Sequence, residues 1–89
     1  MNAPFQPEVI GLDRLPVGSK ARIDSVDWAV LDGGEANRLR QFGFDEGVTV
    51  ELLHFGPFGR DPLAVRVGRM TVAIRRKAAG AVCVTLLNR

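Results

Sequence analysis

The chain of 89 residues and 9.7 kDa is long enough for one small domain and too short for a multidomain enzyme. Hydrophobic residues make up 46% and charged residues 25% of it, as in globular proteins and unlike in disordered chains. The net charge is only +2, but residues 1–51 carry nine acidic and five basic side chains, whereas residues 52–89 carry seven basic and one acidic. We therefore expect a folded domain with one basic face, which would attract an acidic partner or nucleic acid.

The sequence lacks the features that would predict secretion or membrane insertion. Cys83 is the single cysteine, so no intramolecular disulfide can form and nothing favours a secreted protein. The N-terminal residues have neither the basic start nor the apolar stretch of a signal peptide, and no run approaches the roughly 20 apolar residues of a membrane span. We expect a cytoplasmic protein without direct membrane insertion, which reaches any membrane process by docking onto another protein.

The predicted domain covers residues 11–89, because residues 1–10 contain two prolines and no sustained hydrophobic period and are predicted to form a flexible tail. Polar and apolar residues alternate over residues 19–26, which predicts a half-buried strand. The alternation slips at Asp24 and Ser25. A β-bulge there would return the following valine to the core.

A short helix is predicted after Asp32, because Asp32 and Glu35 have the spacing of a capping box. Apolar residues then recur on one face, at Ala36, Leu39 and Phe42. Gly43 is placed to end the helix in the left-handed conformation. A helix of this length is not stable alone, so its apolar face must pack on a sheet.

Alternating apolar residues predict four further strands, at residues 48–53, 63–67, 70–75 and 82–86. Gly68-Arg69 has the form of a two-residue type II′ hairpin turn, residues 56–62 form a loop rich in glycine and proline, and residues 76–80 form a turn. Five short strands and one short helix predict a mainly all-β protein, a small five-stranded antiparallel barrel. Side chains should fill its interior, leaving no ligand cavity.

Few residues could support catalysis or bind a metal. His54 is the only histidine, and Cys83 lies between core positions of a strand, which favours a structural role over a nucleophilic one. A structural zinc site needs four nitrogen or sulfur ligands at short spacing, which this chain lacks. We therefore expect no enzymatic activity and no cofactor. Weak transition-metal binding stays open, through His54 with Glu51 or Asp61, or through His54 between two copies in a homo-oligomer.

Nucleic-acid binding is an alternative function, because Arg66, Arg69 and Arg75 can gather on the outer face and turn of the predicted hairpin. The same face offers only small side chains where bases would stack, at Ala64, Thr71 and Ala73. The sequence contains no tyrosine. We therefore regard nucleic acid as the weaker candidate partner.

Four motifs occur in order along the chain: Leu12–Gly18, Phe42–Gly47, Gly56–Leu63 and Val72–Arg75. Over residues 11–87 the chain thereby resembles the FeoA family, small cytosolic proteins of bacterial ferrous-iron uptake. The resemblance implies an SH3-like barrel. It also implies a non-enzymatic adaptor that docks on FeoB, the membrane GTPase that transports Fe²⁺, and modulates its assembly or activity.

The shared motifs consist mainly of turn glycines and core residues, so they identify the fold better than the binding surface. We predict that the partner contacts the loop beside a barrel opening and the exposed face of the helix, through Phe55, Pro57, Phe58, Arg38 and Arg40. Trp28 precedes the helix, where it would cover the other end of the barrel or form an exposed apolar patch that marks a contact site.

Overall fold

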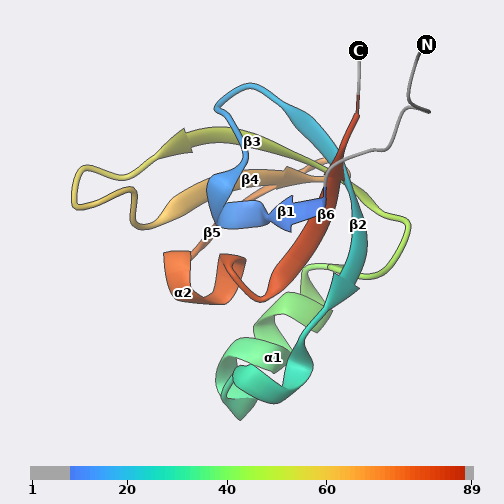
Figure 1. Ribbon diagram of the computed structural model, residues 1–89. Helices are drawn as coiled ribbons and strands as arrows, with labels where there is room; N and C mark the ends of the chain where they lie inside the picture. The colour runs from blue at the N-terminus through green and yellow to red at the C-terminus, as the bar shows by residue number, and fades with distance from the viewer. Residues whose placement is uncertain (1–8, 88–89) are drawn as a thin grey trace, which may run out of the picture.

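The computed structural model describes residues 9–87 and shows one antiparallel sheet with short helices (Figure 1). The sheet has six strands, β1 (Val9–Gly11), β2 (Lys20–Val26), β3 (Thr49–Phe55), β4 (Leu63–Val67), β5 (Met70–Ile74) and β6 (Val82–Leu86). Their order in the sheet is β1-β6-β2-β3-β4-β5, so β1 and β5 are its edges. The prediction of a mainly all-β antiparallel fold is confirmed.

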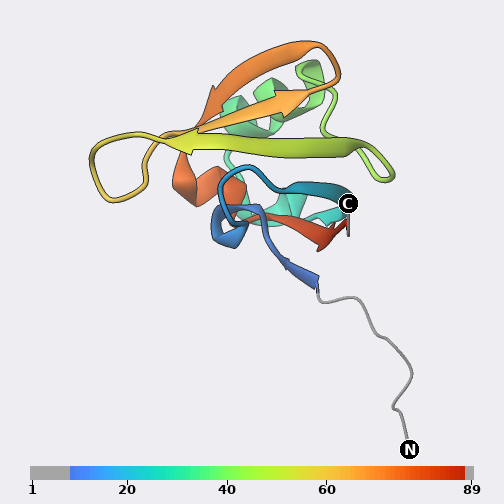
Figure 2. The same cartoon turned by 90° about the horizontal axis from the view of Figure 1, so that it is seen from above.

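The sheet is strongly bent, so that its two halves face each other (Figure 2). The half formed by β3, β4 and β5 lies over the half formed by β1, β6 and β2. Inward-facing residues of both halves fill the space between them, including Ile23, Leu52, Val65 and Val84, each at most 1% exposed. The register shifts between Ile23 and Ser25, which confirms the predicted bulge and increases the twist of β2.

Two elements differ from the sequence-based expectation. Val9 and Ile10, assigned to the flexible tail, belong to β1 and pair with Thr85 and Val84 of β6. Their N–H and C=O groups pair with what would otherwise be an open edge of β6. Hydrophobic periodicity over so few residues does not predict this pairing. Residues 1–8 of the predicted tail lie outside the described residues. The predicted turn at residues 76–80 contains a short helix, α2 (Arg76–Ala79).

The predicted helix is α1 (Gly33–Gln41), preceded by a 3-10 turn, η2 (Trp28–Val30). The Asp32 carboxylate accepts a hydrogen bond from the Glu35 N–H at 2.8 Å, which is one half of the expected capping box. The side chains of Ala36 and Leu39 are buried against the sheet. Gly43 has φ +85°, so the helix ends as predicted. A second 3-10 turn, η1 (Leu12–Arg14), follows β1.

Within residues 9–87, the helices are all too short and too polar to cross a lipid bilayer.

Candidate functional site: the groove along β5

The loop of residues 56–62, between β3 and β4, closes on itself at a narrow neck. The Gly56 N–H donates to the Pro62 carbonyl at 2.6 Å. A Cβ atom on Gly56 would lie 2.5 Å from the Asp61 carbonyl oxygen, a separation that real Cβ atoms essentially never show. Glycine is therefore required at the neck by the close approach of the two backbones.

Asp61 fixes this loop to α2. The backbone N–H of Arg76, at the start of α2, donates to Asp61 Oδ1 at 2.9 Å, and the Arg76 guanidinium donates to the Gly59 carbonyl at 3.3 Å. The first N–H groups of a helix have no partner within it, so a carboxylate from a distant loop satisfies one of them here. The loop and α2 therefore hold each other in place.

Phe58 lies at the tip of this tethered loop and is 83% exposed. The three predicted contact residues of the segment differ in burial, because Phe55 is half-buried against the core while Pro57 and Phe58 are exposed. The Arg60 guanidinium lies 4.0 Å from the centre of the Phe55 ring, a cation–π contact. Arg60 has φ +64°, in the left-handed region that non-glycine residues rarely adopt. Phe55 thus anchors the loop and leaves Phe58 as its exposed aromatic ring.

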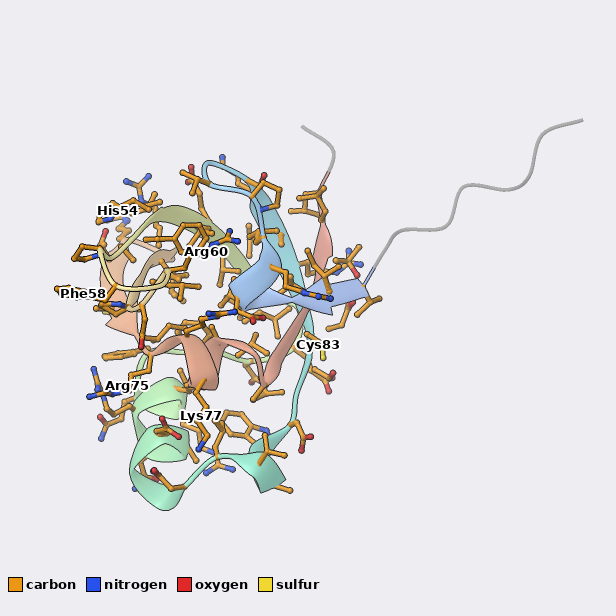
Figure 3. All side chains as sticks on the ribbon, turned by 60° about the vertical axis from the view of Figure 1, so that its left-hand side comes forward. His54, Phe58, Arg60, Arg75, Lys77 and Cys83 are labelled. Atoms are coloured by element: carbon orange, nitrogen blue, oxygen red, sulfur yellow. The ribbon has the colours of Figure 1, made fainter. Side chains whose placement is uncertain are left out.

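A surface hollow of about 400 Å³ lies between this loop, β5 and α1. It is lined by Arg38, Phe58, Asp61, Pro62, Ala73, Ile74 and Arg75. A smaller hollow between α1, β5 and α2 shares Arg38, Ile74 and Arg75 with it, so the two hollows are adjacent. Figure 3 shows Phe58 and Arg75 projecting from the same side of the molecule. We call the two hollows together the β5 groove.

The other predicted contact residues form a separate patch. The Arg40 guanidinium lies 4.2 Å from the centre of the Trp28 ring, and both residues line a different hollow with Gly43, Phe44 and Asp45. Trp28 is half-buried and packs against the core, so its ring connects η2 and α1. The structure therefore places Arg38 with Phe58 in the β5 groove, and Arg40 with Trp28 outside it.

Several residues of the groove did not emerge as candidates from the sequence. The sequence offers Asp61 only as a possible partner of His54 at a metal ion, Pro62 only as part of the loop of residues 56–62, and Ile74 only as part of a predicted strand. Arg75 was assigned to a basic face but not to a site beside Phe58. The sequence does hold one usable signal, the excess of basic residues after residue 52, but it does not show which bases the fold brings to the loop.

The residues considered for catalysis and metal binding lie apart. His54 is exposed near the end of β3, and Cys83 is half-buried in β6 on the opposite side of the view in Figure 3. Glu51 faces Arg66 across the β3–β4 ladder at 3.8 Å, and Asp61 is engaged with α2. Among the residues from 9 to 87, no group of three or more His, Cys, Asp or Glu side chains could hold a metal ion.

The proposed nucleic-acid face is on β4 and β5. Arg66, Arg69 and Arg75 are exposed, but the contact of Arg66 with Glu51 partly offsets its charge. The neighbouring outward positions are Ala64, Thr71 and Ala73. On the strands themselves this face therefore combines positive charge with small side chains, and the exposed Phe58 ring beside Arg75 comes from the neighbouring loop.

Comparison with known proteins relates this fold to one family, because a family model described as the FeoA domain matches residues 10–86. The chain belongs to the FeoA family. Members of this family are small, non-enzymatic SH3-like domains associated with iron uptake, and the bent antiparallel sheet of this chain agrees with membership. A comparison with curated proteins found no match.

Solved structures show the same fold. FeoA from Stenotrophomonas maltophilia, an SH3 domain protein crystallised with zinc, is 36% identical, with TM-score 0.72 over 84% of this chain and 88% of its own. FeoA from Chlorobium tepidum is 29% identical, with TM-score 0.77 over 89% of this chain and 71% of its own. A manganese-dependent transcriptional repressor shares the fold at 18% identity, with TM-score 0.77 over 92% of this chain and 44% of its own.

Proposed function

We propose that this FeoA protein is a cytoplasmic adaptor that docks on the cytoplasmic part of a FeoB-like membrane GTPase and modulates its assembly or activity. The observation that carries the proposal is Phe58, an aromatic ring 83% exposed on a tethered loop and flanked in the β5 groove by Arg38 and Arg75. Aromatic and arginine side chains dominate the binding energy of protein interfaces. An adaptor also needs no catalytic group of its own.

Preorganisation of the loop supports this reading. The contacts of Asp61 and Arg76 with their partners fix the loop before any partner arrives. Binding then costs little conformational entropy for ordering this loop, which favours affinity. Trp28 and Arg40 form a second candidate contact on the same protein, since their stacked pair also presents an aromatic ring and a charge at the surface.

The proposal is tested with a purified cytoplasmic part of FeoB and the full chain in a titration by calorimetry. We expect saturable binding that Phe58→Ala weakens by at least about tenfold, because truncating an interface anchor costs about 2 kcal/mol or more. Val17→Ala is the matched control, since Val17 is an apolar side chain 54% exposed outside the groove. Absence of binding by the unmodified chain at high micromolar concentration contradicts the proposal.

A second candidate function is the response to a transition metal, supported by the zinc bound to the Stenotrophomonas maltophilia relative. We propose that exposed His54 contributes a ligand and that a metal ion bridges two copies of the chain. Calorimetric titrations with Fe²⁺, Co²⁺ and Zn²⁺ should then give different binding curves for the unmodified chain and for His54→Ala. Identical titrations remove His54 from consideration.

A further inference from the structure

The strand β5 has one edge that is not part of the ladder. It pairs with β4 on one side and ends the sheet on the other. The hairpin between them has two residues, Gly68 and Arg69, with Val67 opposite Met70 and φ +60° at Gly68. In such a hairpin the residues next to the turn exchange hydrogen bonds, and hydrogen-bonded pairs then alternate with non-bonded pairs along the ladder.

This alternation assigns the backbone groups of β5 to its two sides. Met70, Val72 and Ile74 bond to β4, so the N–H and C=O groups of Thr71 and Ala73 point away from it. One contact supports the assignment, because the Arg38 guanidinium reaches from α1 and donates to the Ala73 carbonyl at 3.4 Å. Ala73 lines the groove and Thr71 continues the same edge of β5, so this edge presents backbone groups of the kind that pair with another strand.

We propose that β5 accepts an extended acidic segment of a partner protein as a seventh strand, lying in the β5 groove. The inference rests on the proposed adaptor function and specifies the chemistry of the partner. An added strand would pair with Thr71 and Ala73, and its N–H would replace the Arg38 guanidinium at the Ala73 carbonyl. Every second side chain of the segment would then contact apolar groups in the groove, among them Phe58 and Ile74.

The charge along this edge selects an acidic segment. Arg69 is the second residue of the hairpin turn, Arg75 follows β5 directly, and the Arg38 side chain reaches from α1 to β5; all three residues are exposed. Two acidic groups also lie in the groove, but Asp61 accepts a hydrogen bond from the Arg76 N–H of α2, and Glu35 lies in the first turn of α1, in the smaller hollow away from Phe58. Carboxylates at the ends of an added strand would meet arginine, with bidentate geometry available.

The same charges disfavour a second copy of this chain as the occupant. In the antiparallel register that uses both outward residues of each β5 strand, Thr71 of each copy lies opposite Ala73 of the other. That register places Arg69 of each copy opposite Arg75 of the other, and like charges directly opposite each other destabilise a strand pair. An acidic strand reverses both interactions.

The test uses the full chain, labelled with ¹⁵N, and a synthetic peptide of about nine residues with alternating valine and threonine at its centre and two acidic residues at each end. We expect the peptide to shift the amide resonances of β5 and the groove and to slow hydrogen exchange at the Thr71 and Ala73 amides by at least about tenfold. Shifts confined to other surfaces, or no shift at millimolar peptide, overturn the inference.

Two matched peptides separate strand pairing from simple charge attraction. A peptide with lysines in place of the acids should bind at least about tenfold more weakly, and so should an acidic peptide N-methylated at alternate residues, because it cannot donate to β5. Equal binding of the methylated peptide overturns strand addition. If a single-stranded oligonucleotide shifts the same amide resonances as strongly as the peptide does, nucleic acid is favoured as the partner and the proposal of strand addition is overturned.

Variants of the chain give an independent measurement. Ala73→Pro removes an outward N–H without removing a hydrogen bond to β4. It should weaken the binding of the acidic peptide by at least about tenfold. Since this variant could also distort the strand, Arg75→Gln with Arg69→Gln is measured beside it, with Arg14→Gln as the control on η1. Weaker peptide binding by Ala73→Pro and by the Arg69→Gln, Arg75→Gln double variant, with unchanged binding by Arg14→Gln, supports the inference. Unchanged peptide binding by both Ala73→Pro and the double variant overturns it.

The outcome for FeoB separates this inference from the proposed function. If the FeoB part binds the unmodified chain and Ala73→Pro with equal affinity while that variant stays folded, the adaptor function stands and strand addition fails. If the FeoB part does not bind at all while the acidic peptide protects Thr71 and Ala73, the adaptor function fails and the edge of β5 still binds acidic strands.

Discussion

The interior of the bent sheet and the β5 groove differ in the residues that they contain and in how far these residues are exposed. In the interior, side chains such as Leu52 and Val84 are fully buried, and glycines set the turns that close the sheet. In the groove, Phe58 is exposed, arginines gather around it, and a backbone edge faces outward. The comparison teaches that the motifs shared with the FeoA family supply much of the groove as well as the barrel, because six of the seven residues that line the larger hollow lie within Gly56–Leu63 and Val72–Arg75, and only Arg38 comes from outside the motifs.

Leu39→Ala should produce the largest effect on stability, because Leu39 is 1% exposed and joins α1 to the core. We expect a loss of about 2–5 kcal/mol in the free energy of unfolding, measured by denaturant titration. Asn37→Ala, on the exposed side of the same helix, is the control and should change stability by less than about 0.5 kcal/mol. A Leu39→Ala effect no larger than that of the control would place this helix face outside the core.

Two glycine substitutions should have opposite signs and test the end of α1. Gly43→Ala should destabilise the protein by about 1–2 kcal/mol, because φ is +85° there and an L-residue is strained in that conformation. Gly33→Ala should be neutral or stabilising by up to about 1 kcal/mol, since a Cβ there meets nothing within 4 Å and alanine favours the helix. Thermal unfolding measures both, and equal effects would contradict the left-handed helix end.

Asp61→Ala should destabilise the protein by about 0.5–2 kcal/mol, because the variant loses the acceptor for the Arg76 N–H at the start of α2. Asp27→Ala is the matched control, since Asp27 precedes η2 without a side-chain capping bond. Hydrogen exchange at the Arg76 amide should increase in Asp61→Ala and stay unchanged in the control. An unchanged rate in both would mean that Asp61 does not fix the loop to α2.

Phe58→Ala should have the smallest effect on stability, less than about 0.5 kcal/mol, because the side chain is 83% exposed and leaves no cavity. The same variant should lose at least about tenfold in partner affinity. A loss of stability comparable to that of Leu39→Ala would assign Phe58 to the core. The groove would then lose its exposed aromatic anchor.

Local patterns in the sequence predicted much of the interior and little of the groove. Alternation located the four strands from residue 48 onward, and the spacing of Asp32 and Glu35 located α1, because each signal lies within a few residues. The pairing of Val9 and Ile10 with β6 joins segments some 75 positions apart, and no local period reports it.

The groove could be predicted only in part for the same reason. Phe58 and Arg38 were each expected at a contact surface, but their shared groove depends on how α1 packs beside β5. The capping of α2 by Asp61 joins residues 15 positions apart, and no pattern within the loop of residues 56–62 indicates it. The exposed aromatic ring, the arginine side chains and the open edge of β5 come from separate parts of the sequence, and only the folded structure brings them together on one surface.

The central claim is that the β5 groove, and not the patch of Trp28 and Arg40, receives the partner. Mapping of ¹⁵N amide shifts on the full chain during titration with the cytoplasmic part of FeoB tests it most directly. The predicted result is a continuous set of shifted resonances over the loop of residues 56–62, β5 and the Arg38 side of α1. Shifts centred on Trp28 and Arg40, with β5 unchanged, would contradict it.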